Sequence, residues 1–146
     1  MQAIEFHTGI EDPVGFAVRL LRKAYRQRAR VLVTANTATL ERLSRQLWAG
    51  HGHEREFIAH VRVDRCRSGQ AARTPLWLAA EVSGMAHEPG VVINLGAAAP
   101  SEPAGLERLI EIVSSEELDA AEGRQRWRLY KAAGLAVTHV NAGAST

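Results

Sequence analysis

The chain has 146 residues, 46% of them hydrophobic, which is typical of one globular domain with a substantial core. Its 18 basic and 16 acidic residues leave a net charge of only +2, which excludes a protein that coats nucleic acid through bulk positive charge. One cysteine, Cys66, excludes an internal disulfide, and the absence of a long apolar run or signal-like N-terminus predicts a cytoplasmic protein without membrane spans.

The first half of the sequence alternates between strand and helix patterns. Residues 3–7 alternate in polarity like a short strand, and residues 14–27 repeat apolar side chains at helical spacing. Residues 30–35 form a β-branched apolar run typical of a buried strand, and Asn36 or Thr37 can cap the helix that follows. This alternation favours a parallel sheet with helical crossovers.

The middle of the sequence is less regular. A segment rich in glycine and histidine at residues 49–53 is predicted to break the second helix, and residues 57–61 fit a short strand or a packed loop. Residues 65–74 and 97–105 are predicted to be loose connections. Further strands are predicted at residues 75–79, 90–96, 106–113 and 135–140.

The last helix is predicted from a capping box to a closing glycine. Ser114 with Glu117 fits the capping box, and Gly134 is expected to end the helix in the left-handed conformation. One arc of this helix is predicted to face the core and carries Leu118, Ala121, Gln125, Leu129 and Ala132. The neighbouring outward arc carries Arg124, Trp127, Arg128 and Lys131.

Together these elements predict an α/β fold, a three-layer α/β/α sandwich on a mostly parallel sheet. We expect a single domain over residues 1–146, with residues 141–146 as a loose tail. The class is nucleotide-binding-like, but the turns after the strands contain neither a glycine-rich run nor a lysine followed by serine or threonine. The sequence therefore lacks a phosphate loop, and no cofactor is expected.

Catalytic and metal sites are not supported by the residue patterns. No serine has the flanks of a nucleophile elbow, and the acid pairs 11–12 and 116–117 are explained by their positions at helix starts. His51, His53 and His60 could converge with Asp64 on a metal, but a polar surface loop explains them better. We therefore predict a binding module without catalytic or metal-ligating residues.

Two aromatic regions are candidates for binding. The outward arc around Trp127 is either a solvated basic helix end or a cation-rimmed aromatic site that suits an acidic, hydrophobic ligand. Trp48, with Phe57 and His60, is either part of the core or a second contact surface. The residues alone leave both choices open.

The chain resembles the chi subunit of bacterial DNA polymerase III over nearly its whole length. The resemblance is carried, in order, by Phe6 with His7, residues 30–33, Leu47 and Trp48 with Phe57 and His60, residues 91–95, 111–113 and 124–134. It implies a non-catalytic accessory protein that pairs with the psi subunit of the clamp-loader complex. It also implies binding to the acidic, phenylalanine-terminated tail of single-stranded-DNA-binding protein.

The resemblance also implies site residues. The tail would bind at Val113, Arg124, Trp127 and Arg128, with the stem of Lys131 beside the phenylalanine, and psi would face Trp48, Phe57 and His60. Trp127 and Arg128 stand where the family often has tyrosine and lysine, which keeps the aromatic and charged character. Two alternatives remain: a module that binds single-stranded nucleic acid directly, and an enzyme with a degenerate nucleotide pocket. A helicase is a further candidate partner.

Overall fold

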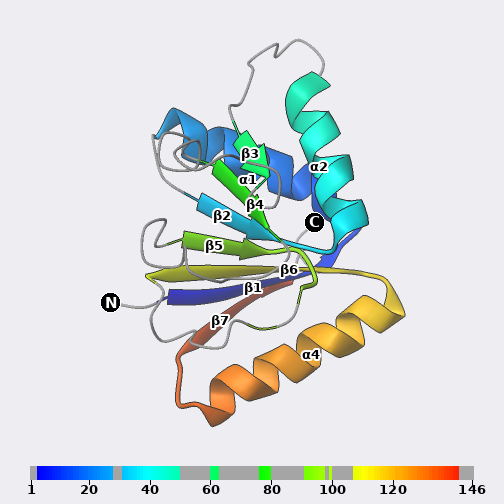
Figure 1. Ribbon diagram of the computed structural model, residues 1–146. Coiled ribbons are helices and arrows are strands. Elements are labelled where there is room, and N and C mark those ends of the chain that lie inside the picture. Colours follow the sequence, from blue (N-terminus) through cyan, green and yellow to red (C-terminus); the bar gives the residue numbers. More distant parts are fainter. Residues whose placement is uncertain are drawn as a thin grey trace.

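One parallel sheet forms the centre of the molecule (Figure 1). The structure is a computed structural model that describes residues 3–27, 31–49, 60–62, 76–79, 91–97, 99 and 107–141. Its seven strands follow the order β3-β4-β2-β5-β6-β1-β7, and each neighbouring pair runs parallel. The strands are β1 (Ala3–Ile10), β2 (Val31–Thr34), β3 (His60–Arg62), β4 (Leu76–Ala79), β5 (Val91–Asn94), β6 (Arg108–Ser114) and β7 (Val137–Asn141).

Helices cover both faces of this sheet, as predicted for a three-layer α/β/α sandwich. The described helices are α1 (Pro13–Arg26), α2 (Thr37–Ala49) and α4 (Glu117–Ala132). In Figure 1, α1 and α2 lie together in the upper half, and α4 crosses below the sheet. The core has two parts accordingly: one contains side chains of α1 and α2, and the other contains Tyr130 of α4. The predicted fold class is confirmed.

The buried strands supply side chains to both parts of the core. In β2, Val31 and Val33 pack with α1 and α2, whereas Leu32 packs on the α4 side with Val92 of β5. Successive side chains of a strand point to opposite faces, so a strand covered on both faces must be apolar throughout. This requirement explains the continuous apolar runs that the sequence shows there.

Polar side chains begin the first two helices where the sequence predicts them. Asp12 accepts a hydrogen bond from the Gly15 N–H at 3.0 Å, and Pro13 occupies the first turn of α1. Asn36 accepts from the Thr39 N–H at 2.8 Å and so caps α2.

The two ends of α4 differ in how well the sequence predicts them. The capping box is wrong, because Ser114 belongs to β6 and the N-cap position is Glu116, which makes no side-chain cap. Asp119 instead accepts from the Ser114 N–H at 2.7 Å and ties the first turn to the end of β6. At the other end Gly134 has φ +80°, and its N–H bonds Lys131 O at 3.0 Å, which confirms the predicted left-handed closure.

Some sequence predictions concern segments outside the described residues. These include the helix break predicted at 49–53, apart from Ala49, which is the last residue of α2, and also the connection at 65–74 and most of the 97–105 segment. The predicted loose tail begins one residue too early, because Asn141 is the last residue of β7. No helix in the described part of the chain is long and apolar enough to cross a membrane.

Candidate functional site: two grooves beside helix α4

The buried face of α4 is not the predicted one. Leu118 and Leu129 are 66% and 60% exposed, and Gln125 and Ala132 are exposed as well. The buried positions are instead Gly123, Arg126 and Tyr130. The helix therefore turns its polar and small residues toward the sheet and leaves two leucines in solvent. The prediction was wrong because it placed the aliphatic arc inside, whereas an ion pair and a close backbone approach decide the orientation.

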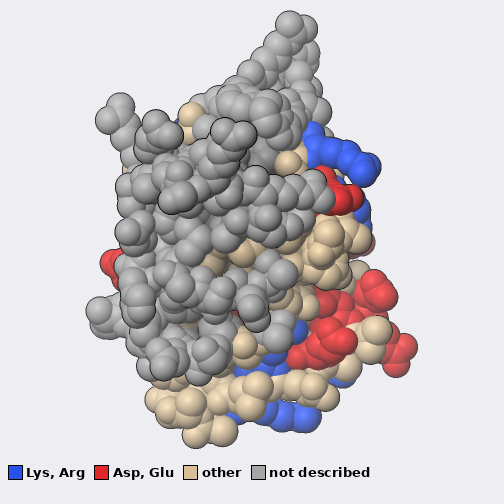
Figure 2. Space-filling model, viewed as in Figure 1, with Lys and Arg blue, Asp and Glu red and all other residues tan. Residues whose placement is uncertain are grey.

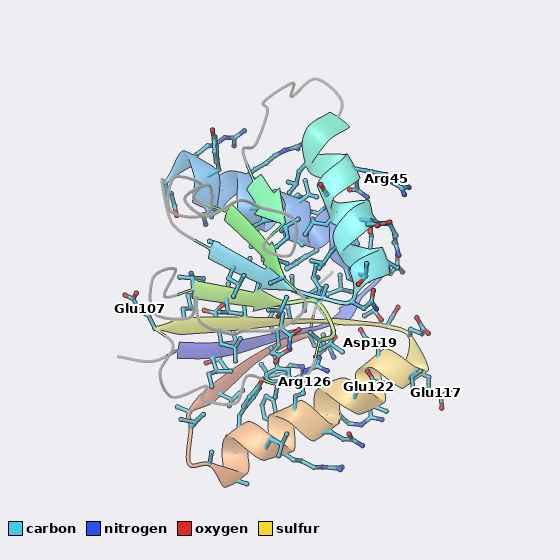
Figure 3. All side chains as sticks on the ribbon, viewed as in Figure 1. Arg45, Glu107, Glu117, Asp119, Glu122 and Arg126 are labelled. Atoms are coloured by element: carbon cyan, nitrogen blue, oxygen red, sulfur yellow. The ribbon has the colours of Figure 1, made fainter. Side chains whose placement is uncertain are left out.

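The ion pair joins Arg126 to Glu111 in the middle of β6. Arg126 Nε donates to Glu111 Oε1 at 3.0 Å, and the Tyr130 hydroxyl donates to Glu111 Oε2 at 2.5 Å. Asn94 of β5 adds a third donor at 3.2 Å. Glu111 is fully buried and Arg126 nearly so, and Figure 3 shows Arg126 between α4 and the sheet. Three donors from two elements thus hold one carboxylate and orient α4 over β5 and β6.

Burial changes the acid–base properties of this cluster. Loss of hydration raises the pKa of the Glu111 carboxyl above its ordinary value, although the charge of Arg126 and the hydrogen bonds it accepts act in the opposite direction. Burial, followed by the neighbouring Glu111 charge, raises the pKa of the Tyr130 hydroxyl, which stays protonated and donates to the carboxylate. The cluster is therefore a structural anchor with no access to solvent.

A glycine brings α4 close to the sheet beside this anchor. A Cβ placed on Gly123 would lie 2.9 Å from both Cγ atoms of Val113 on β6, closer than such atoms approach in proteins. Only glycine fits this contact without a shift of the helix. Val113 itself is 2% exposed, so it supplies the apolar base of the space next to the helix.

A groove opens on the side of α4 that faces β7, with a volume of about 460 Å³. We call it the Trp127 groove. Its lining combines the carboxyl ends of β1, β6 and β7 with one side of α4, and it consists of Phe6, Thr8, Gly9, Val113, Ser114, Ser115, Ala120, Gly123, Arg124, Trp127, His139 and Asn141.

Trp127 is held in this groove by its neighbours. Its indole is half-buried and meets the Phe6 ring edge-on at 5.3 Å between centroids and the His139 ring edge-on at 5.8 Å. The Lys131 ammonium lies 5.4 Å from the centre of the indole, within range of a cation–π interaction. The tryptophan thus packs against the edge of the core and also forms one wall of the groove.

The strand opposite Trp127 bends at the groove. The register between β1 and β6 shifts between His7 and Ile10, and Gly9 in this interval has φ +70°. Such a bulge re-aims the side chains around it. Thr8, the residue before this glycine, shares a hydrogen bond of 2.6 Å with Nε2 of His139 on β7.

A second groove, of about 500 Å³, lies on the other side of α4. We call it the acidic groove, because Glu11, Glu116, Asp119 and Glu122 line it together with one arginine, Arg42. Figure 2 shows acidic side chains gathered over the start of α4. In many α/β proteins ligands bind at the carboxyl edge of the sheet, but acids there repel the phosphates of a nucleotide. Ser114 and Ser115 line both grooves and form the ridge between them.

The residues predicted for tail binding lie together. Val113, Arg124 and Trp127 all line the Trp127 groove. Arg128 and Lys131 are exposed on the same arc of α4, outside the lining but next to it. The residues predicted to face psi are not tested, because Phe57 and the side chains of Trp48 and His60 lie outside the described part of the structure. Of the residues considered for a metal, His51, His53 and Asp64 also lie outside it.

Sequence reasoning missed the strand side of the Trp127 groove. Phe6 and Thr8 come from β1, and His139 and Asn141 come from β7; in each strand the two residues are two positions apart. Period-two spacing places such residues on one face, so the signal was present. What the sequence does not contain is the pairing of β1 with β7, which brings segments more than a hundred residues apart side by side.

Comparison with known proteins identifies one matching family. The family model described as DNA polymerase III chi subunit, HolC, matches residues 1–138. No curated protein matches the chain.

Proposed function

The chain belongs to the chi-subunit family of DNA polymerase III, whose members are accessory subunits of the replicative polymerase, and we propose that it works there as a non-catalytic adaptor. In this proposal the Trp127 groove binds the acidic, phenylalanine-terminated tail of single-stranded-DNA-binding protein. A second surface binds the psi subunit and thereby the clamp loader. The protein would then act in the cytoplasm, beside lagging-strand template.

The observation that supports tail binding is the chemistry of the groove. Its base is apolar, formed by Phe6, Val113 and the half-buried Trp127. Its rim carries the exposed side chain of Arg124, with Arg128 and Lys131 on the same arc. A ligand that places an aromatic ring in the base and carboxylates at the rim satisfies both parts.

The rim suits several carboxylates on one short segment. The planar guanidinium groups of Arg124 and Arg128 can each grip a carboxylate through two hydrogen bonds. Lys131 adds a point charge 5.4 Å from the centre of the Trp127 indole, and its apolar stem can cover part of a bound ring. One buried ring with a few exposed ion pairs corresponds to an affinity on the order of micromolar, or about −8 kcal/mol. Such a contact can form and release as synthesis proceeds.

The elements that carry two of the residues proposed for psi binding lie away from this groove. Trp48 belongs to α2, which Figure 1 places on the opposite side of the sheet from α4. Phe57 and His60 follow it in the sequence, with His60 opening β3 at the far edge of the sheet. Two partners on opposite sides could bind at the same time, which an adaptor requires.

Titration of the native chain and of Trp127→Ala with an acidic peptide that ends in phenylalanine tests the proposal. We expect the variant to bind at least tenfold more weakly, about 1.4 kcal/mol, because the wall that contacts the phenylalanine is removed. Arg124→Ala should also weaken binding, more at low salt than at high salt. Arg45→Ala is the matched control, because it removes an exposed arginine from α2, far from the groove (Figure 3). Undiminished affinity of Trp127→Ala would overturn the assignment.

The same titration with a bare oligonucleotide separates tail binding from direct nucleic-acid binding. The exposed cations Arg124, Arg128 and Lys131 beside an indole are also what a single-stranded nucleic acid contacts. The acidic groove on the other side of α4 limits the length of strand that could lie there. We expect the peptide to bind more tightly than the oligonucleotide at equal salt, and the reverse order would favour the alternative.

A further inference from the structure

The strand wall of the Trp127 groove carries an aromatic side chain, His139, that is not among the residues predicted to bind the tail. Parallel pairing sets Phe6 of β1 opposite His139 of β7, and Thr8 opposite Asn141. Phe6 and Val137 pack in the α4 part of the core, so alternation places Thr8 and His139 on this same face. His139 is exposed, and it lines the groove at the edge that α4 leaves uncovered.

The His139 ring is held in place from two sides. Its Nε2 shares the 2.6 Å hydrogen bond with the Thr8 hydroxyl, and its edge contacts the Trp127 indole at an angle of 73° between the ring planes. Exposed histidines without such contacts sample several rotamers, and fixing one rotamer on binding costs conformational entropy. Here the protein has already oriented the ring, so a ligand that contacts it loses less affinity to ordering.

The two rings form a corner. Trp127 and His139 stand nearly perpendicular to each other, and Phe6, which is 2% exposed, lies at the base and meets Trp127 at 69°. Aromatic rings prefer edge-to-face and offset contacts with centroids about 4.5–7 Å apart, and a perpendicular pair offers a third ring both kinds of contact at once. Such a corner discriminates a flat aromatic side chain from an aliphatic one.

We propose that His139, positioned by Thr8, is a specificity residue of the Trp127 groove and contacts the terminal aromatic ring of the acidic peptide. The inference rests on the proposed function. It extends that site from α4 to β7, so that the peptide lies across the groove, with its carboxylates on the cations of α4 and its ring in the Trp127–His139 corner.

A double-mutant cycle tests this contact. The affinities of native protein and of His139→Ala are measured for the phenylalanine-ended peptide and for the same peptide ending in alanine. We expect His139→Ala to weaken the first peptide roughly three- to tenfold, the range of an aromatic pair, and to leave the second nearly unchanged. Thr138→Ala is the matched control, because Thr138 is exposed on the opposite face of the same strand and should change neither affinity.

Thr8→Val tests the positioning role, since it keeps the branched shape and removes the hydroxyl. We expect a loss of about twofold for the phenylalanine-ended peptide and none for the alanine-ended one. Thermal unfolding of each variant shows whether the fold is kept.

The outcomes separate this inference from the proposed function. If Trp127→Ala weakens binding but His139→Ala does not, or weakens both peptides equally, His139 does not contact the ring and the inference fails alone. If the native chain does not bind the phenylalanine-ended peptide, the proposed function fails and the inference with it.

Discussion

The two grooves beside α4 share a ridge and differ in charge. The Trp127 groove is apolar at its base and has Arg124 at its rim, whereas the acidic groove is lined by Glu11, Glu116, Asp119 and Glu122. Ser114 and Ser115 line both. One helix thus divides the carboxyl edge of a single sheet into a side that attracts carboxylates and a side that repels them.

The difference follows from how α4 is rotated on the sheet. With Gly123, Arg126 and Tyr130 turned inward, Asp119 and Glu122 line the groove on one side of α4, and Arg124 lines the groove on the side of β7. A specific site commonly needs repulsion against wrong placements as well as attraction toward the right one. If the Trp127 groove binds an acidic peptide as proposed, the acidic groove would supply that repulsion, because a peptide placed across the ridge would meet four carboxylates.

The largest effect is expected when the buried Glu111–Arg126 pair, which orients α4 between the two grooves, is disrupted. We expect Arg126→Met to lower the free energy of unfolding by about 3–5 kcal/mol, because it leaves the Glu111 carboxylate buried without its cation. Urea denaturation measures the loss. The double variant Arg126→Met with Glu111→Gln removes the buried charge and keeps an oxygen acceptor for Tyr130, so it should be more stable than the single variant. A loss below about 1 kcal/mol in the single variant would contradict the anchoring role.

A smaller effect would show whether the acidic groove repels the peptide. Glu122→Gln removes one exposed carboxylate from that groove, and we expect it to raise the affinity for the acidic peptide about twofold, the size of a single exposed charge interaction. The gain should vanish in about 1 M salt, where the screening length is about 3 Å. Glu107→Gln is the control, because it removes the same charge at the opposite end of the sheet (Figure 3). Equal gains in both variants would mean that only net charge matters.

The smallest expected effect concerns the outward leucines. Leu129 is 60% exposed, so Leu129→Gln should change the free energy of unfolding by no more than about 0.5 kcal/mol. Thermal or chemical unfolding measures the change, and Leu43→Gln in the core of α2 provides the contrast of a fully buried leucine. A loss of several kcal/mol for Leu129→Gln would mean that Leu129 faces the core, as the sequence pattern predicts, and would contradict the orientation of α4 described above.

The sequence predicted those features that depend on neighbouring residues, namely buried strands, a helix cap and a helix end. The apolar runs of β2 and β5, the Asn36 cap and the Gly134 closure depend on neighbouring residues, and the structure has them within one or two residues of the predicted bounds. Helical spacing also placed Arg124, Trp127 and Arg128 on one arc, which is geometry internal to the helix.

The tertiary structure alone decided which arc of α4 is buried and what stands opposite Trp127. Helical periodicity tells which residues share a face, but it assigns the buried face by hydrophobicity, and here a glycine contact and the Glu111–Arg126 pair outweigh two leucines. Both depend on a partner strand that lies elsewhere in the sequence. The His139 wall likewise exists only because β7 pairs with β1 across more than a hundred residues, a distance over which local pattern carries no information.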